Sequence, residues 1–97
     1  MHHLQPISPG EILLEEYLKP LGISQNRLSR DLDIPVSRVL EIIRGGRAIT
    51  ADTALRLGEY FGTTPELWLN LQVEYDLRRL RAKVPEIKRR VRPYKAA

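Results

Sequence analysis

Four hydroxyl residues stand directly before helix-like segments of this 97-residue chain and divide it into short pieces. A hydroxyl oxygen at such a position can accept a hydrogen bond from the free N–H groups of the first helical turn. The four N-cap candidates are Ser8, Ser24, Thr50 and Thr64. Pro20 and Gly22 are expected to end the first helix, and Gly45-Gly46 the third. Because no strand-like alternation competes, the pattern predicts an all-α fold of five short helices.

Apolar residues recur at helical spacing within each of these segments and predict one buried side per helix. The predicted core consists of Ile12, Leu13, Leu14, Tyr17, Leu28, Leu32, Val39, Ile42, Ile43, Ala54, Leu57, Phe61, Leu67, Trp68, Leu71, Tyr75 and Leu80. Trp68 and Tyr75, seven residues apart on the fifth predicted helix, are also expected to pack in the core. Part of the face that they share can instead form a dimer contact. A chain of this length can bury such a core without disulfides or metals.

The composition narrows the class of protein. There is no cysteine, which excludes disulfides and thiolate metal sites and fits a reducing compartment. No apolar run reaches the roughly 20 residues of a membrane span, and the N-terminus lacks a signal-peptide pattern. We therefore expect a soluble, cytoplasmic protein with no membrane partner.

The positive charge of the chain is concentrated at its C-terminal end. Residues 78–97 contain nine Lys or Arg and one Glu, a net charge of +8, so residues 1–77 carry −4 of the chain's +4. The high sequence pI of the chain, about 9.8, is therefore caused by the charges of the tail. By itself it does not establish a nucleic-acid-binding surface. The tail is expected to be either a solvated segment or a source of additional phosphate contacts.

The segment PVSRVLEIIRGGR, residues 35–47, separates into two faces on a helix of about 100° per residue. Its apolar side chains fill an arc of about 160°. Those side chains are Val36, Val39, Leu40, Ile42 and Ile43. Ser37, Arg38, Glu41 and Arg44 occupy the opposite arc of about 120°. A charged outer face is the usual state of a surface helix, so this pattern alone does not separate solvation from recognition.

The connection before this segment favours recognition. Only three residues, DIP, separate it from the preceding short helix, which is typical of a tight helix-turn-helix. Gln25 and Asn26 lie at the N-terminus of that preceding helix, where free N–H groups and the helix dipole favour a phosphate. Arg44 and Arg47 flank the far end of the second helix of the motif. We expect a helix-turn-helix DNA-binding domain over residues 1–82 and a basic C-terminal tail over residues 83–97, which can hold a further helical turn.

The chemistry of the polar arc assigns roles to individual residues. Arg38 can donate two hydrogen bonds to guanine O6 and N7, and Glu41 can accept one from cytosine N4. Ser37 can donate or accept, while Val36 and Leu40 border the arc and can contact a thymine methyl group. Because its charge repels DNA, Glu41 must either read a base or orient an arginine. The predicted base-reading residues are Val36, Ser37, Arg38 and Glu41, and the predicted phosphate-binding residues are Gln25, Asn26, Arg44 and Arg47.

Long stretches of the sequence resemble one family. The run from Ser8 to Tyr75 contains PGEILLEEYLKPLGIS and IRGGRAITADTALRLGEYFGTTPELWLNLQ, followed by YDL. These stretches are similar to the HigA-type (VapI-like) antitoxins of the Xre/phage-repressor helix-turn-helix family, and the ending VRP fits the same family. The family positions that face DNA fall on Gln25, Val36, Ser37, Arg38, Glu41, Arg44 and Arg47. Ser8 stands where the family often has histidine, and Gly46 where it often has a basic residue.

The resemblance implies a five-helix Xre/lambda-repressor-like domain with a basic C-terminal extension. It also implies a homodimer that binds an inverted repeat in its own promoter and represses that operon. The implied protein partner is a HigB-type toxin, a RelE-like mRNA endonuclease that the antitoxin neutralises. Toxins of this class are usually basic. The basic tail is therefore not expected to bind the toxin electrostatically, because like charges repel each other.

Two other readings of the sequence remain, a stand-alone regulator without a toxin and a module that binds only proteins. An enzyme is not expected, because the chain has no cysteine, no internal histidine and no phosphate-binding glycine loop. His2 and His3 lack further ligands for a metal, so neither a metal site nor a cofactor is expected. No small-molecule substrate is expected either.

Overall fold

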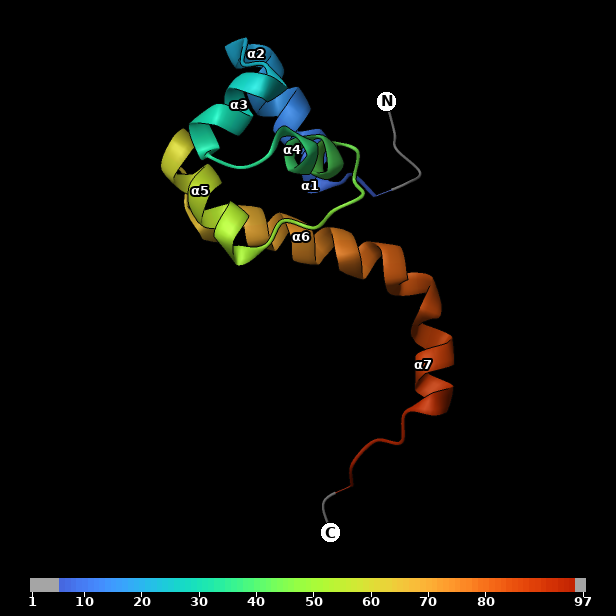
Figure 1. Cartoon of the computed structure of the whole chain (residues 1–97). Helices are drawn as coiled ribbons and strands as arrows, with labels where there is room; N and C mark the ends of the chain where they lie inside the picture. Colours follow the sequence, from blue (N-terminus) through green and yellow to red (C-terminus); the bar gives the residue numbers. More distant parts are fainter. Residues whose placement is uncertain (1–5, 96–97) are drawn as a thin grey trace.

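The computed structural model describes residues 6–95, most of which are helical (Figure 1). The elements are α1 (Pro9–Ile12), the π-helical η1 (Leu13–Leu18), α2 (Lys19–Leu21), α3 (Gln25–Leu32), α4 (Val36–Ile43), α5 (Ala51–Phe61), α6 (Pro65–Leu80), the 3-10 turn η2 (Arg81–Lys83) and α7 (Val84–Arg90). The first three run without a break as one helix. The described part therefore has five helices up to Leu80, then α7, and no strand, which confirms the all-α prediction. His2 and His3 lie outside the described residues.

The four predicted N-caps are confirmed. Each hydroxyl oxygen accepts from the backbone N–H three residues later, with donor–acceptor distances of 3.0–3.3 Å. At the end of α4, Gly45 has a φ of 80°, a left-handed conformation that glycine adopts without steric cost. The hydroxyl signals were thus sufficient to place the starts of α1, α3, α5 and α6, whereas α4 begins after Pro35 without a side-chain cap.

The first helix ends at Gly22, as predicted, but Pro20 does not interrupt it. The helix continues through Pro20 to Leu21, and Gly22, with a φ of 66°, ends it. A proline inside an α-helix clashes with the carbonyl four residues earlier. The π-helical stretch before Pro20 relieves this conflict: the Lys19 N–H reaches back five residues to the Leu14 carbonyl and widens the turn.

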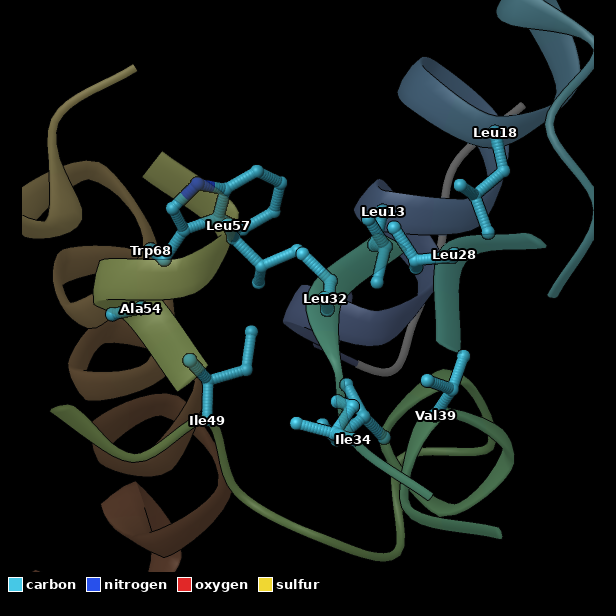
Figure 2. Packing of buried hydrophobic residues seen from close by; sticks show 11 residues of the cluster. Leu13, Leu18, Leu28, Leu32, Ile34, Val39, Ile49, Ala54, Leu57 and Trp68 are labelled. Carbon is cyan, nitrogen blue, oxygen red and sulfur yellow. The ribbon is translucent and has the colours of Figure 1, made fainter. Parts of the chain in front are cut away.

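The core lies between the first helix, the α3–α4 pair and the α5–α6 pair (Figure 2). Trp68 is fully buried, its Nε1 donates to Thr63 Oγ1 at 2.9 Å, and its ring lies 5.0 Å from that of Tyr17. Most predicted core positions are buried or half-buried. Leu67 and Leu80 are exceptions, 36% and 44% exposed, because one lies in the first turn of α6 and the other beyond the globular body. Leu18, Ile34 and Ile49 are buried although the sequence pattern did not include them.

Gly10 fixes the distance between α1 and α4. A Cβ atom at this position would lie 2.6 Å from the Ile42 carbonyl carbon and 2.8 Å from the Ile43 Cα. Real Cβ contacts with backbone atoms do not become this short, so only glycine fits. Since both contacted residues are in α4, Gly10 sets how closely that helix sits against the body.

Candidate nucleic-acid interface

The turn between α3 and α4 contains Asp33, Ile34 and Pro35, as the sequence predicted. Asp33 adopts a left-handed conformation with a φ of 57°, which Asp tolerates better than most residues. The Ser29 hydroxyl donates to the Ile34 carbonyl at 2.5 Å, and the Ile34 N–H donates to the Ser29 carbonyl at 3.1 Å. With Ile34 buried beneath it, the turn holds α3 and α4 in one fixed arrangement.

Arg56, on α5, braces this turn from the other side. Its Nη1 donates to the Leu32 carbonyl at 2.8 Å and to the Asp33 carbonyl at 3.3 Å, while its Nε donates to Asp52 at 2.9 Å. The carbonyls at a helix C-terminus have no intrahelical donor, so a cation is favoured there. The sequence did not indicate this role, because the four-residue spacing of Asp52 and Arg56 is that of any ion pair on a helix surface.

A second polar contact joins α3 to α5. The Tyr60 hydroxyl donates to the Asp31 carboxylate at 2.6 Å. This hydrogen bond holds the pKa of Asp31 below its usual value, helped by the charge of Arg27 and opposed by partial desolvation. The same bond raises the pKa of Tyr60, because the phenol must remain protonated to donate.

The outer face of α4 carries the predicted base-reading residues. Ser37, Glu41 and Val36 are exposed and Arg38 is half-buried, while Val39 and Ile42 are packed in the core. The predicted split between a buried and a polar side of this helix is therefore present. The exposed side points away from the body, where a flat or concave partner can approach it.

The N-terminus of α3 lies beside this face. Gln25, Asn26, Val36 and Leu40 are among the residues lining one open surface hollow of about 670 Å³. The Ser24 hydroxyl caps the Arg27 N–H, and the other N–H groups of a first helical turn lack intrahelical acceptors. Two predicted phosphate-binding residues and one predicted base-reading residue are thus brought together.

The two arginines after α4 are placed differently from each other. Arg44 is exposed at the C-cap of α4, where it was expected. Arg47 instead folds back beside the helix: the Gly46 N–H donates to the Glu41 carbonyl at 2.9 Å, and Arg47 Nη2 lies 3.6 Å from Glu41 Oε1. Glu41 therefore has an arginine partner, one of the two situations in which its negative charge is compatible with DNA.

Gln72, on α6, positions the loop between α4 and α5. Its Oε1 accepts from the buried Ile49 N–H at 2.8 Å, and its Nε2 donates to Asp76 at 3.1 Å. Gln72 was not among the residues predicted from the sequence. A signal was present, because Gln72 follows Trp68 by four residues and so occupies a core-facing position with a polar side chain.

Replacing Gln72 with alanine is expected to lower the free energy of unfolding by about 1 kcal/mol, because the Ile49 N–H loses its buried acceptor. The loop that carries Arg47 is also expected to loosen. Chemical denaturation measures the first effect, and amide hydrogen exchange at Ile49 measures the second. Asn70→Ala, an exposed change on the same helix, is the control; equal losses in the two variants would contradict this role for Gln72.

Within residues 6–95, no cluster of three or more metal-ligating side chains is found. In the same part of the chain, no helix has both the length and the apolar character needed to cross a membrane.

The arrangement of α3, the three-residue turn and α4 is matched by a family model. The helix-turn-helix model HTH_3 aligns with residues 14–68, more than half of the chain. The chain belongs to the helix-turn-helix family. Its sequence is 53% identical to virulence-associated protein I of Dichelobacter nodosus over 77 residues, which cover 79% of this chain and 71% of that protein.

Solved structures agree with this assignment. A HigA-family addiction module antidote protein from Coxiella burnetii superimposes on this helix-turn-helix chain with a TM-score of 0.83 and 51% identity, covering 94% of this chain and 100% of that one. The Pseudomonas aeruginosa antitoxin HigA, solved with the higBA promoter, gives a TM-score of 0.85 and 41% identity, with coverages of 94% and 100%. The resemblance to HigA-type antitoxins is thereby confirmed.

Proposed function

We propose that this chain is an antitoxin that binds the operator of its own operon as a homodimer, represses transcription, and neutralises a HigB-type toxin. The observation that supports this most is the exposed polar face of α4 beside the N-terminus of α3. The similarity to an antitoxin solved with its own promoter supports the same conclusion. The function proposed is binding, without catalysis.

On this proposal α4 lies in the major groove with its N-terminal half toward the bases. Arg38 donates to guanine O6 and N7, and Ser37 and Glu41 contact neighbouring base edges. Val36 packs against a thymine methyl group. Arg47 accompanies Glu41 and moves between its carboxylate and a phosphate, so that the acidic side chain does not face the DNA without a counter-charge.

Gln25 and Asn26, with the free N–H groups of α3, are proposed to hold a phosphate on one side of the groove. Arg44 and Arg47 hold the backbone on the other side. Residues 1–82 form the DNA-binding domain in this scheme, and residues 83–97 form an extension of it that leaves the recognition surface free.

The DNA-binding part is tested with a fragment of the protein's own promoter. Binding is expected to discriminate this fragment from a scrambled one and to weaken linearly with the logarithm of salt concentration. Equal affinity for both fragments at every salt concentration would contradict the proposal.

The toxin part is tested separately by co-expression with the neighbouring gene. Co-purification of a small basic protein, and relief of its toxicity, is the expected result. DNA binding without any such partner would favour the stand-alone regulator.

Replacing Arg44 with alanine is expected to weaken binding to operator and scrambled DNA alike, because a phosphate contact carries no sequence information. The slope of log affinity against log salt should fall by about one unit. Fluorescence anisotropy at several salt concentrations measures both quantities. Lys95→Ala, a basic change in the C-terminal extension that lies outside the proposed recognition surface, is the control that should leave the slope unchanged.

A further inference from the structure

The loop between α4 and α5 passes beside α6, and the two enclose a small cleft of about 150 Å³ (Figure 1). Arg47 lies on the loop side of this cleft, and Gln72, Tyr75, Asp76 and Arg79 lie on the α6 side. Arg47, a proposed phosphate contact, therefore lies against a helix that is not itself part of the proposed recognition surface. This raises the question of what α6 does to Arg47.

Arg47 is held between two fixed points of the loop. Before it, the Gly46 N–H donates to the Glu41 carbonyl at 2.9 Å. After it, Ile49 is buried, and the Ile49 N–H donates to Gln72 Oε1 at 2.8 Å. Two residues lie between these points, so a shift of the second point also moves Arg47.

The Gln72 amide can hold the loop in one of its two orientations. Its oxygen accepts hydrogen bonds and its nitrogen donates them, so a reversed amide would bring two donors together at Ile49. Asp76 selects the working orientation, because an ionised carboxylate can only accept. Gln72 Nε2 donates to Asp76 Oδ1 at 3.1 Å. With its nitrogen turned to Asp76, the amide presents its oxygen to the loop.

Arg79 in turn fixes the carboxylate of Asp76. Arg79 Nη2 donates to the same Asp76 Oδ1 at 3.1 Å, and the guanidinium carbon lies 4.9 Å from the centre of the Tyr75 ring. The Tyr75 hydroxyl adjoins the loop itself, since a Cβ atom added at Gly45 would lie 3.9 Å from it. Contacts therefore continue from the partly exposed side of α6, through Gln72, to the loop.

We propose that Asp76 is a positioning residue of the DNA-binding surface: it orients the Gln72 amide, and the amide places Arg47 against the DNA backbone. The inference rests on the proposed function and adds to it a residue that touches no DNA. It also makes a prediction about sign. A negative charge by itself weakens binding to DNA, so removing Asp76 would strengthen binding if its charge were its only effect.

The first test compares Asp76→Leu with Asp76→Asn in the full chain. Both new side chains branch at the same atom as aspartate and carry no charge, but only asparagine keeps an oxygen that accepts from Gln72. Asp76→Leu is expected to bind the operator about fivefold more weakly than Asp76→Asn, the effect of one ordinary hydrogen bond. Asp76→Asn should bind at least as tightly as the unmodified protein. Fluorescence anisotropy measures these affinities.

Two further readouts separate positioning from a general loss of stability. Amide exchange at Ile49 should be about fivefold faster in Asp76→Leu than in Asp76→Asn, with equal rates at Leu57 in the core. In an Arg47→Ala background the two Asp76 variants should bind the operator equally, because the side chain that the loop places is gone. Equal binding while Arg47 is present, or the same fivefold difference after its removal, would overturn the inference.

Exchanging the amide and the acid gives a second test. Gln72→Glu alone brings two carboxylates together, and their repulsion should loosen the loop and weaken operator binding. In Gln72→Glu/Asp76→Asn the new amide can donate to the new carboxylate, which accepts from Ile49, so binding should recover. Gln72→Glu/Glu74→Gln removes the same charge from the same helix and is the control. Recovery no greater than in this control would overturn the inference.

Failure of the inference can be told apart from failure of the proposed function, because amide exchange at Ile49 is measured without DNA. If the unmodified protein does not discriminate operator from scrambled DNA, the proposed function fails. The exchange comparison then still shows whether Asp76 holds the loop. If the operator is bound specifically while Asp76→Leu and Asp76→Asn exchange and bind alike, the inference fails and the proposed function stands.

Discussion

Gly10→Ala is expected to lower the free energy of unfolding by about 3 kcal/mol or more, a larger loss of stability than we expect for Gln72→Ala. Alanine is the better helix former by about 1 kcal/mol, so helix propensity alone predicts the opposite sign. The clash decides the outcome, because the new methyl group would lie 2.6 Å from the Ile42 carbonyl carbon and neither backbone can yield without moving a helix. Moving α4 also displaces the proposed DNA-reading face.

Thermal or chemical denaturation measures this effect, and Gly46→Ala is its control. At Gly46 an added Cβ would have its nearest neighbour, the Glu41 carbonyl oxygen, at 3.7 Å, an ordinary contact. The control should therefore change stability by less than about 0.5 kcal/mol. A stable Gly10→Ala protein with unchanged operator affinity would show that α1 and α4 do not need this close approach.

Arg38→Ala is expected to cost about 1–3 kcal/mol of operator affinity and to remove the preference at one base pair. The reason is that the variant loses the bidentate contact to guanine that we propose for Arg38, while the proposed phosphate contacts remain. Affinity for scrambled DNA should fall much less. Binding to a set of operators with single base-pair changes measures the loss of preference.

Arg44→Ala is the matched comparison, since it also removes one arginine from the same region. The two variants should differ in which property they lose. Arg38→Ala should lose discrimination between base pairs, and Arg44→Ala should lose affinity for all DNA sequences. If Arg38→Ala lowers affinity for operator and scrambled DNA equally, Arg38 is a phosphate contact and its assignment as a base reader is wrong.

Local signals in the sequence predicted much of the fold. Hydroxyl residues at Ser8, Ser24, Thr50 and Thr64 mark helix starts because the cap is a short-range interaction between neighbouring residues. The three-residue turn before Val36 was predictable for the same reason. Such features depend on the backbone geometry of a few consecutive residues, so they can be predicted directly from the sequence.

Features that depend on distant contacts, or on a rare local backbone geometry, were not predicted. The constraint on Gly10 comes from the backbone of α4, more than thirty residues away. The helix passes through Pro20 because a π-helical stretch precedes it, and no propensity rule anticipates that stretch. Leu80 fitted the apolar pattern of α6 but lies beyond the body, which the pattern of one helix cannot reveal.

In the candidate site, too, some residues could be predicted from the local sequence pattern and others could not. Periodicity alone placed Ser37, Arg38 and Glu41 on one side of α4. The groups that hold this helix in position, Arg56 and Gln72, required the structure, because each acts on backbone atoms more than twenty residues away. The position of Arg47 beside Glu41 likewise follows from the fold of the loop.

The positive charge of the chain and its proposed recognition surface lie in different parts of the molecule. The +8 of residues 78–97 made the whole chain basic, yet the proposed recognition surface lies elsewhere, on α4 and the start of α3. Basic composition and DNA recognition are therefore assigned to different parts of the molecule.

The central claim, that α4 and the start of α3 are the DNA-binding surface, is tested most directly by NMR of the ¹⁵N-labelled protein titrated with an operator duplex. The amide signals expected to shift are those of residues 24–27, 36–41 and 44–47, with much smaller changes in residues 84–95. A scrambled duplex should produce weaker shifts. Shifts confined to residues 78–95, equal for both duplexes, would contradict the account and assign DNA binding to the basic tail.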